Sequence, residues 1–245
     1  MSTPIDVIPV CIAILAVALL YSSVGHAGAS GYIAVMTLFG IAPGVVKPTA
    51  LVLNVLVATI ASIQYWRAGH FSWSLFWPFG VLSVPLAFVG GFFNLPVPWF
   101  QVLVGVVLLL SALRFLTSPA PDGEVRAPRR GVAIGVGGSL GLLAGLTGTG
   151  GGIFLTPLVL LLRWARTKSA AAVSAVFILV NSTAGLAGNL LATHTMPTVA
   201  GALAATAILG GTLGSYFGSR RFDPVVVKRL LAIVLTIAGL KLVFA

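Results

Sequence analysis

The residues with the clearest chemical potential form two glycine-rich segments, one in each half of the chain. The first contains Gly25, His26, Gly28, Ser30 and Gly31, and the second is the run Gly148, Thr149, Gly150, Gly151 and Gly152. Glycine tolerates positive φ and close backbone approach, so such segments can point several N–H groups into one cavity. Short helices that begin near Ser30 and Gly152 would add positive charge from their N-terminal ends. The two segments therefore predict an anion site built from backbone.

Two asparagines accompany these segments. Asn54 and Asn181 lie on the helices expected after each glycine segment, and Ser182 follows the second asparagine. A buried amide needs partners, so these side chains either donate to a bound anion or hydrogen-bond the interrupted backbone, and both alternatives stay open. His26 is the one titratable side chain expected near the site, with an ordinary pKa near 6.5. It could carry a coupling proton, donate to the anion, or simply pack.

The acidic residues are few and lie at one terminus or in loops. They are Asp6, Asp122, Glu124 and Asp223. Cation carriers usually place a carboxylate within the membrane, so a cation substrate is disfavoured. No paired histidines or acid–histidine grouping suggests a metal, a cofactor or a catalytic triad. We therefore expect a small anion as the partner and no enzyme activity.

Composition indicates which elements must position these groups. Of 245 residues, 58% are hydrophobic and 7% are charged, whereas charged residues make up roughly 25% of soluble domains. Apolar stretches long enough to cross about 30 Å of hydrocarbon recur along the chain. A formal charge of +10 arises mainly from loop residues, which is typical of membrane topology signals rather than nucleic-acid binding. The sequence thus predicts one multi-pass domain, residues 1–245, whose other partner is the lipid bilayer.

The chain contains an internal repeat. A shift of 120 residues pairs Gly28 with Gly148, and a shift of 127 pairs Asn54 with Asn181. We assign repeat 1 to about 5–117, a linker to 118–130 and repeat 2 to about 131–245. Each repeat has a first apolar stretch (8–24 and 131–146), a short one (32–41 and 153–162) and three longer helices. The longer helices are expected at 47–66, 74–93 and 99–116, and again at 169–191, 198–217 and 225–244.

The basic residues indicate how the chain crosses the membrane. If each broken pair makes no net crossing, Lys47 and Lys241 lie on one face. The other face then carries Arg67, Arg114, Arg126, Arg129, Arg130, Arg163, Arg166, Lys168, Arg220, Arg221, Lys228 and Arg229. This bias predicts that both termini lie outside the cytoplasm and that the second repeat is inverted. Each broken pair is either two full crossings or a re-entrant hairpin. The fold class expected is an all-α polytopic membrane protein of two inverted repeats.

Scattered glycines and one lysine have simpler interpretations. We expect close helix packing rather than binding at Gly90, Gly91, Gly210, Gly211 and Gly214. Lys47 could attract anions at the outer mouth, but an ordinary interfacial lysine is the preferred interpretation.

The sequence from Gly148 to Leu158, its weaker first copy and the segment 174–182 resemble the TauE/SafE sulfite exporter family. The resemblance implies a bacterial inner-membrane carrier with about eight transmembrane segments for sulfite or related organosulfonates. The first copy lacks the glycine triplet and the proline, so the Ser30 hydroxyl would replace a backbone donor. We predict a secondary transporter that exports such anions, with an anion channel as the alternative. The particular anion, the direction of transport and the oligomeric state, a homo-oligomer included, stay open.

Overall fold

The protein is helical throughout the part of the chain that the structure describes. The computed structural model describes residues 7–93, 98–117, 122–194 and 201–244. Its first half contains α1 (Val7–Ser23), α2 (Ala29–Leu38), α3 (Pro43–Arg67), α4 (Trp73–Phe92) and α5 (Pro98–Thr117). Its second half contains α6 (Arg130–Thr147), α7 (Gly152–Leu161), α8 (Thr167–Thr193), α9 (Gly201–Tyr216) and α10 (Pro224–Phe244), with the π-helical turn η1 (Phe217–Arg221) before α10.

Each predicted apolar stretch corresponds to one helix, so the all-α fold class is confirmed. Three helices, α3, α5 and α10, begin with a proline, which suits a first-turn position because that N–H has no partner within the helix. Asp6, both chain ends and residues 118–121 of the predicted linker lie outside the described residues.

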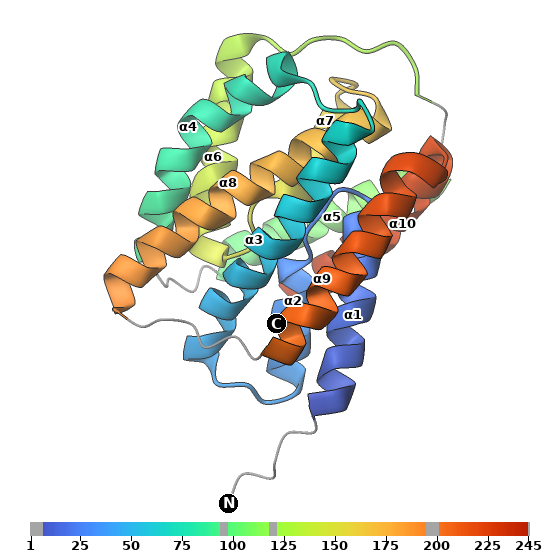
Figure 1. The fold of residues 1–245 in the computed structure, drawn as a ribbon. Helices are drawn as coiled ribbons and strands as arrows, with labels where there is room; N and C mark the ends of the chain where they lie inside the picture. The colour runs from blue at the N-terminus through green and yellow to red at the C-terminus, as the bar shows by residue number, and fades with distance from the viewer. Residues whose placement is uncertain (1–6, 94–97, 118–121, 195–200, 245) are drawn as a thin grey trace, which may run out of the picture.

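Two helices, α2 and α7, are half-length. Each has ten residues, or about 15 Å at 1.5 Å per residue, against roughly 30 Å of hydrocarbon. In Figure 1, α2 turns back toward the end of the molecule at which α1 and α3 begin. In the same way α7 returns to the opposite end, at which α6 and α8 begin. Each broken pair therefore starts and finishes at one end, and neither α2 nor α7 is long enough to cross alone.

Helices from the two halves pack against each other. The contacts join α1 to α9, α4 to α6, α3 to α8, and α5 to α10. Glycine permits the closest approaches: a Cβ at Gly145 would overlap the Ala87 carbonyl of α4, and one at Gly214 would overlap the Leu19 carbonyl of α1. The predicted packing glycines make such contacts with neighbouring helices, namely Gly90, Gly91, Gly210, Gly211 and Gly214. That prediction is confirmed, and small residues hold the bundle together.

The surface of the bundle is apolar. Four of the described helices, α3, α4, α6 and α8, are long and apolar enough to cross a membrane by length and composition. Large apolar side chains also point outward: Ile8 is 74% exposed and Leu110 is 61% exposed. Such a surface is explained by contact with lipid rather than water.

The basic loops meet at the end of the molecule that carries the linker (Figure 1). The Arg126 N–H donates to the Arg163 carbonyl at 2.8 Å, which joins the linker to the turn between α7 and α8. The Ser219 carbonyl in η1 accepts from Lys168 Nζ at 3.4 Å and lies 2.9 Å from His70 Nε2. The loop between α3 and α4 therefore reaches this end too.

Candidate functional site

Both glycine segments are breaks at which a half-length helix begins. α2 starts at Ala29, one residue before the predicted start, and α7 starts at Gly152 as predicted. The residues that precede them, Gly28 and Gly151, have φ of 103° and 78°. Neither makes a side-chain cap, so the first N–H groups of both helices need another partner, which can be a side chain, water or a ligand.

One side chain joins the two breaks. Asn54, fully buried in α3, accepts a hydrogen bond at Oδ1 from the Ala29 N–H at 2.9 Å. Its Nδ2 donates to the Thr149 carbonyl at 3.3 Å and to Ser182 Oγ at 3.1 Å. Of the two roles left open for Asn54, this geometry matches hydrogen bonding to the interrupted backbone. We call Ala29, Asn54, Thr149 and Ser182 the Asn54 node.

Gly150 leaves the space that the node needs. Its φ is 74°, and a Cβ at this position would lie 2.6 Å from Ser182 Oγ and 2.9 Å from Asn54 Nδ2. Both the backbone conformation and the lack of room therefore require glycine. The neighbouring Gly152 faces the Ile178 side chain of α8, so the second break is packed closely along that helix.

Asn181 contrasts with its repeat counterpart. It is fully buried in α8, yet neither its Oδ1 nor its Nδ2 has a hydrogen-bond partner among the described residues. An unpaired buried polar group costs about 1–3 kcal/mol, and its retention in a protein calls for a water, an ion or a ligand. Asn181 is therefore a predicted site residue whose amide is available to something other than the protein.

Hydroxyl groups surround His26 and Ser30. His26 is 2% exposed, with Nε2 3.3 Å from Thr156 Oγ1, and that hydroxyl donates to Ser174 Oγ at 2.6 Å. Ser30 Oγ donates to the Tyr21 phenol oxygen at 3.1 Å. Tyr21, Thr156 and Ser174 are not among the predicted site residues. A hydroxyl within an otherwise apolar stretch is the signal that could have found them.

Two lysines also reach the breaks. Lys241 Nζ donates to the Ser30 carbonyl at 3.2 Å. The Lys47 stem passes Gly148, where a Cβ would lie 2.9 Å from Lys47 Cγ, and its Nζ donates to the Phe93 carbonyl at 3.0 Å. These are the two lysines predicted to lie opposite the other basic residues. Each lysine therefore brings positive charge close to one break.

Not every predicted site residue faces the same space. A Cβ at Gly25 would overlap the Ala171 backbone of α8, and one at Gly31 would lie 2.5 Å from Val17 Cγ1 of α1. These two glycines hold helices together, and neither lines the cavity between the breaks.

That cavity is small and has no acidic lining. It measures about 10 Å³ and is lined by both breaks, including Gly28, Ser30 and Thr149. Such a volume holds about one water molecule, so an oxyanion could enter only after the surrounding helices separate. None of the residues lining this cavity is a carboxylate, and no cluster suited to a metal ion occurs in the described ranges.

Comparison with known proteins identifies the family. The family model described as Sulfite exporter TauE/SafE matches residues 10–242, which include both breaks and the Asn54 node. The chain belongs to the TauE/SafE sulfite exporter family. A TauE/SafE protein of this length also occurs in Sinorhizobium fredii (strain NBRC 101917 / NGR234), under the name probable membrane transporter protein y4hK. The two are 35% identical over 244 residues, which cover 98% of this chain and 99% of the relative. No solved structure matches the chain.

Family membership and the apolar helices agree on the general role. As a TauE/SafE protein the chain is a membrane transporter. The resemblance carried by the second glycine segment is therefore confirmed. Within this TauE/SafE fold, the breaks are where two half-length helices, the buried Asn54 and two lysines come together.

Proposed function

We propose that this TauE/SafE protein is a secondary transporter that exports a small sulfur-containing oxyanion, such as sulfite or an organosulfonate, across the bacterial inner membrane. The substrate binds between the two breaks, where backbone N–H groups, the Asn181 amide and hydroxyl groups supply donors. An oxyanion suits this lining because backbone N–H groups and the hydroxyl groups of Tyr21 and Ser30 can donate to it, and no carboxylate lines the cavity between the breaks. The N-terminal ends of α2 and α7 also favour a negative charge, because their backbone N–H groups carry partial positive charge.

The observation that carries the proposal is the Asn54 node. Asn54 ties the N–H of Ala29, at the start of α2, to the carbonyl of Thr149, three residues before α7 begins. The N-terminal ends of both half-length helices are therefore held beside one cavity, each with a partial positive charge of about half a unit. Lys241 and Lys47 add charge beside the breaks. An anion at this point would meet favourable electrostatics from both halves of the chain.

Two inverted repeats account for the helix contacts. α1 packs on α9 while its counterpart α6 packs on α4, and the counterparts α3 and α8, and α5 and α10, pack on each other. A pseudo-two-fold axis that relates the two repeats would produce this pattern of contacts. The axis lies in the membrane plane if the two broken pairs start at opposite faces. Placing the basic loops in the cytoplasm puts both termini outside. The eight longer helices of the described residues then correspond to the eight or so transmembrane segments that the resemblance implies. The half-length helices α2 and α7 each enter the membrane and do not cross it.

The closed cavity favours a carrier over an anion channel. A space of about 10 Å³ cannot pass an oxyanion, so each transport cycle requires the two halves to move. Export of an anion is driven by an inside-negative potential, which supplies about 2.3 kcal/mol per charge per 100 mV. If a proton is coupled to transport, His26 is the residue to carry it, because it lies buried at the first break.

Transport by the purified protein in liposomes tests this proposal. We expect saturable sulfite flux with counterflow, and loss of that flux in Gly151→Leu, because Gly151 has φ 78° and a Cβ there would lie 2.9 Å from Phe177. Gly40→Leu is the matched control: Gly40 has φ 71° but no neighbour within 4 Å. Flux that survives in Gly151→Leu would contradict the site, and single-channel currents would favour the channel. A pH dependence abolished by His26→Gln would show proton coupling.

A further inference from the structure

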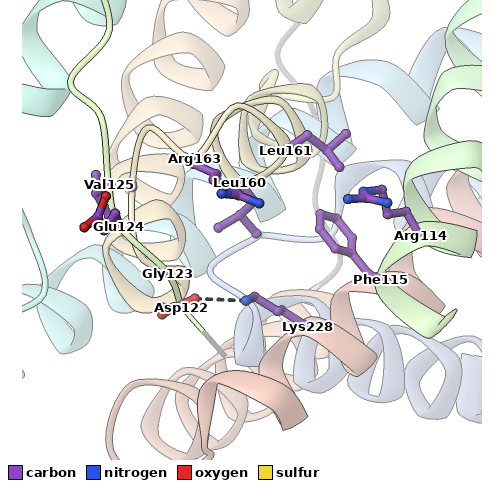
Figure 2. A pocket seen from close by; sticks show the side chains of 11 residues that line it. Arg114, Phe115, Asp122, Gly123, Glu124, Val125, Leu160, Leu161, Arg163 and Lys228 are labelled. Carbon is purple, nitrogen blue, oxygen red and sulfur yellow. Dashed lines mark ion pairs between the residues drawn. The ribbon is translucent and has the colours of Figure 1, made fainter. Parts of the chain in front are cut away.

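A second polar pocket lies at the end of the molecule where the basic loops meet. It has a volume of about 290 Å³ and lies between the end of α5, the linker, the turn after α7 and the start of α10. Figure 2 shows Arg114 and Arg163 turned toward its interior beside the apolar side chains of Phe115 and Leu160. α7 separates this pocket from the second break by its ten residues, or about 15 Å. The pocket is therefore distinct from the proposed substrate site.

The acidic groups of this pocket do not neutralise its arginines. Asp122 pairs with Lys228 at 2.9 Å and also accepts hydrogen bonds from the N–H and the hydroxyl of Thr167. Glu124 is exposed, as are both arginines, and in Figure 2 it lies across the pocket from Arg114, with Arg163 between them. The guanidinium groups of Arg114 and Arg163 form no ion pair within the described part of the chain. Two positive charges therefore face one space without an internal partner.

Arg163 occupies a backbone position that favours glycine. Its φ is 56°; its N–H donates to the Leu160 carbonyl, and the Trp164 N–H donates to the Val159 carbonyl, which is the Schellman pattern of a helix end. The other half-length helix ends with the same two bonds, and there the residue is Gly40, with φ 71°. Glycine adopts this conformation without the clash that a Cβ introduces. Keeping an arginine here points to a use for its side chain.

We propose that this pocket binds a phosphate-type oxyanion between Arg114 and Arg163. The planar guanidinium group matches two oxygens of a phosphate with parallel hydrogen bonds. The volume of about 290 Å³ leaves room for more than one phosphate group. Two sources carry this chemistry: free inorganic phosphate, and the head group of an anionic phospholipid. Arg114 precedes the linker and Arg163 follows it, so a bound anion would connect the two halves of the transporter.

Thermal unfolding of the purified full chain tests the pocket. One arm titrates sodium phosphate against sodium chloride at equal ionic strength, and the other compares lipid nanodiscs of phosphatidylglycerol with those of phosphatidylcholine. A ligand that binds only the folded protein raises the unfolding temperature with concentration. A rise with phosphate identifies the free anion as a ligand, whereas a rise with phosphatidylglycerol alone identifies the lipid head group. Either result supports the site when it depends on the arginines.

The variants make that dependence measurable. Arg163→Gly removes the guanidinium while placing a better-suited residue at φ 56°, so it should fold at least as well as the wild type. It should need about tenfold more ligand for the same shift, as should Arg114→Gln. Arg67→Gln removes an exposed charge from α3 outside the pocket and should keep the full response. A full response in Arg163→Gly, an equal loss in Arg67→Gln, or no response to either probe would overturn the proposal.

Discussion

Replacing Asn181 with leucine should make the protein more stable and less active. Asn181 is fully buried, and both polar atoms of its amide lack a partner among the described residues. Leucine has a similar volume, so the change should open no large cavity. Because an unpaired buried polar group costs about 1–3 kcal/mol, the free energy of unfolding should rise by about 1 kcal/mol or more.

Asn54→Leu is the matched control at the equivalent repeat position. It removes three hydrogen bonds and leaves the Ala29 N–H, the Thr149 carbonyl and the Ser182 hydroxyl without this partner. Hydrogen bonds between membrane helices contribute about 0.6–2 kcal/mol each, so the loss should reach about 2–6 kcal/mol. The same chemical change is therefore expected to have opposite signs at the two asparagines.

Two assays on each variant separate structure from function. Stability is measured by thermal or dodecyl sulfate unfolding in detergent, and transport by sulfite counterflow in liposomes at equal protein content. Asn181→Leu should lower transport about tenfold, the effect of one lost hydrogen bond to a charged ligand, while its stability rises. A stability loss equal to that of Asn54→Leu would show that the Asn181 amide has a structural partner. A stabilised variant with the wild-type transport rate would remove Asn181 from the substrate site.

Gly150→Ala should destabilise the protein more than Gly40→Ala, because both have positive φ (74° and 71°) but only Gly150 has close neighbours; equal shifts in unfolding temperature would contradict this. Burial raises the pKa of the Asp122 carboxyl, but its hydrogen bonds to Thr167 and its contact with Lys228 together lower the pKa by more than burial raises it. The pKa therefore lies below the ordinary 3.8. Its stabilisation is complete above an unfolded pKa near 3.9 and is lost as pH falls through the lower folded value. Unfolding temperatures measured from pH 6 to pH 3 should therefore drop more in the wild type than in Asp122→Asn, and parallel curves would argue against it. Lys241→Gln should raise the half-saturating sulfite concentration about tenfold with little change in unfolding temperature, whereas an unchanged value would separate this lysine from substrate binding.

The helices were predictable because their signals are local. Apolar runs bounded by glycine or proline gave ranges close to those observed; for example, the helix expected at 153–162 is α7, Gly152–Leu161. The main difference lies at the start of α3, which begins at Pro43 rather than at residue 47. Proline fits the first turn of a helix, so the helix extends back to that residue. Such boundaries depend on a few neighbouring residues and not on the rest of the fold.

The candidate site was predictable only in part. The glycine breaks and the helix starts beside them follow from residue types, but the two asparagines have the same chemistry and equivalent positions in the repeat. Only the packing of α3 and α8 against the breaks gives Asn54 three hydrogen bonds and leaves Asn181 with none in the described part of the chain. Packing also places the hydroxyl groups of Thr156 and Ser174 beside His26. No spacing in the sequence connects these residues to His26.

By itself, the sequence determined the membrane character, the helical fold class and the two breaks. It also indicated that no acidic side chain would lie near the breaks. These properties depend on composition and on the conformational freedom of glycine, which act within a short stretch of chain. Tertiary structure decided which groups meet: Lys241 donates to a carbonyl 211 positions away, and Asn54 to one 95 positions away. It also placed Arg114 and Arg163 at one pocket. Hydrogen bonds and charge pairs act over a few ångströms, so their partners are defined only once the helices have packed.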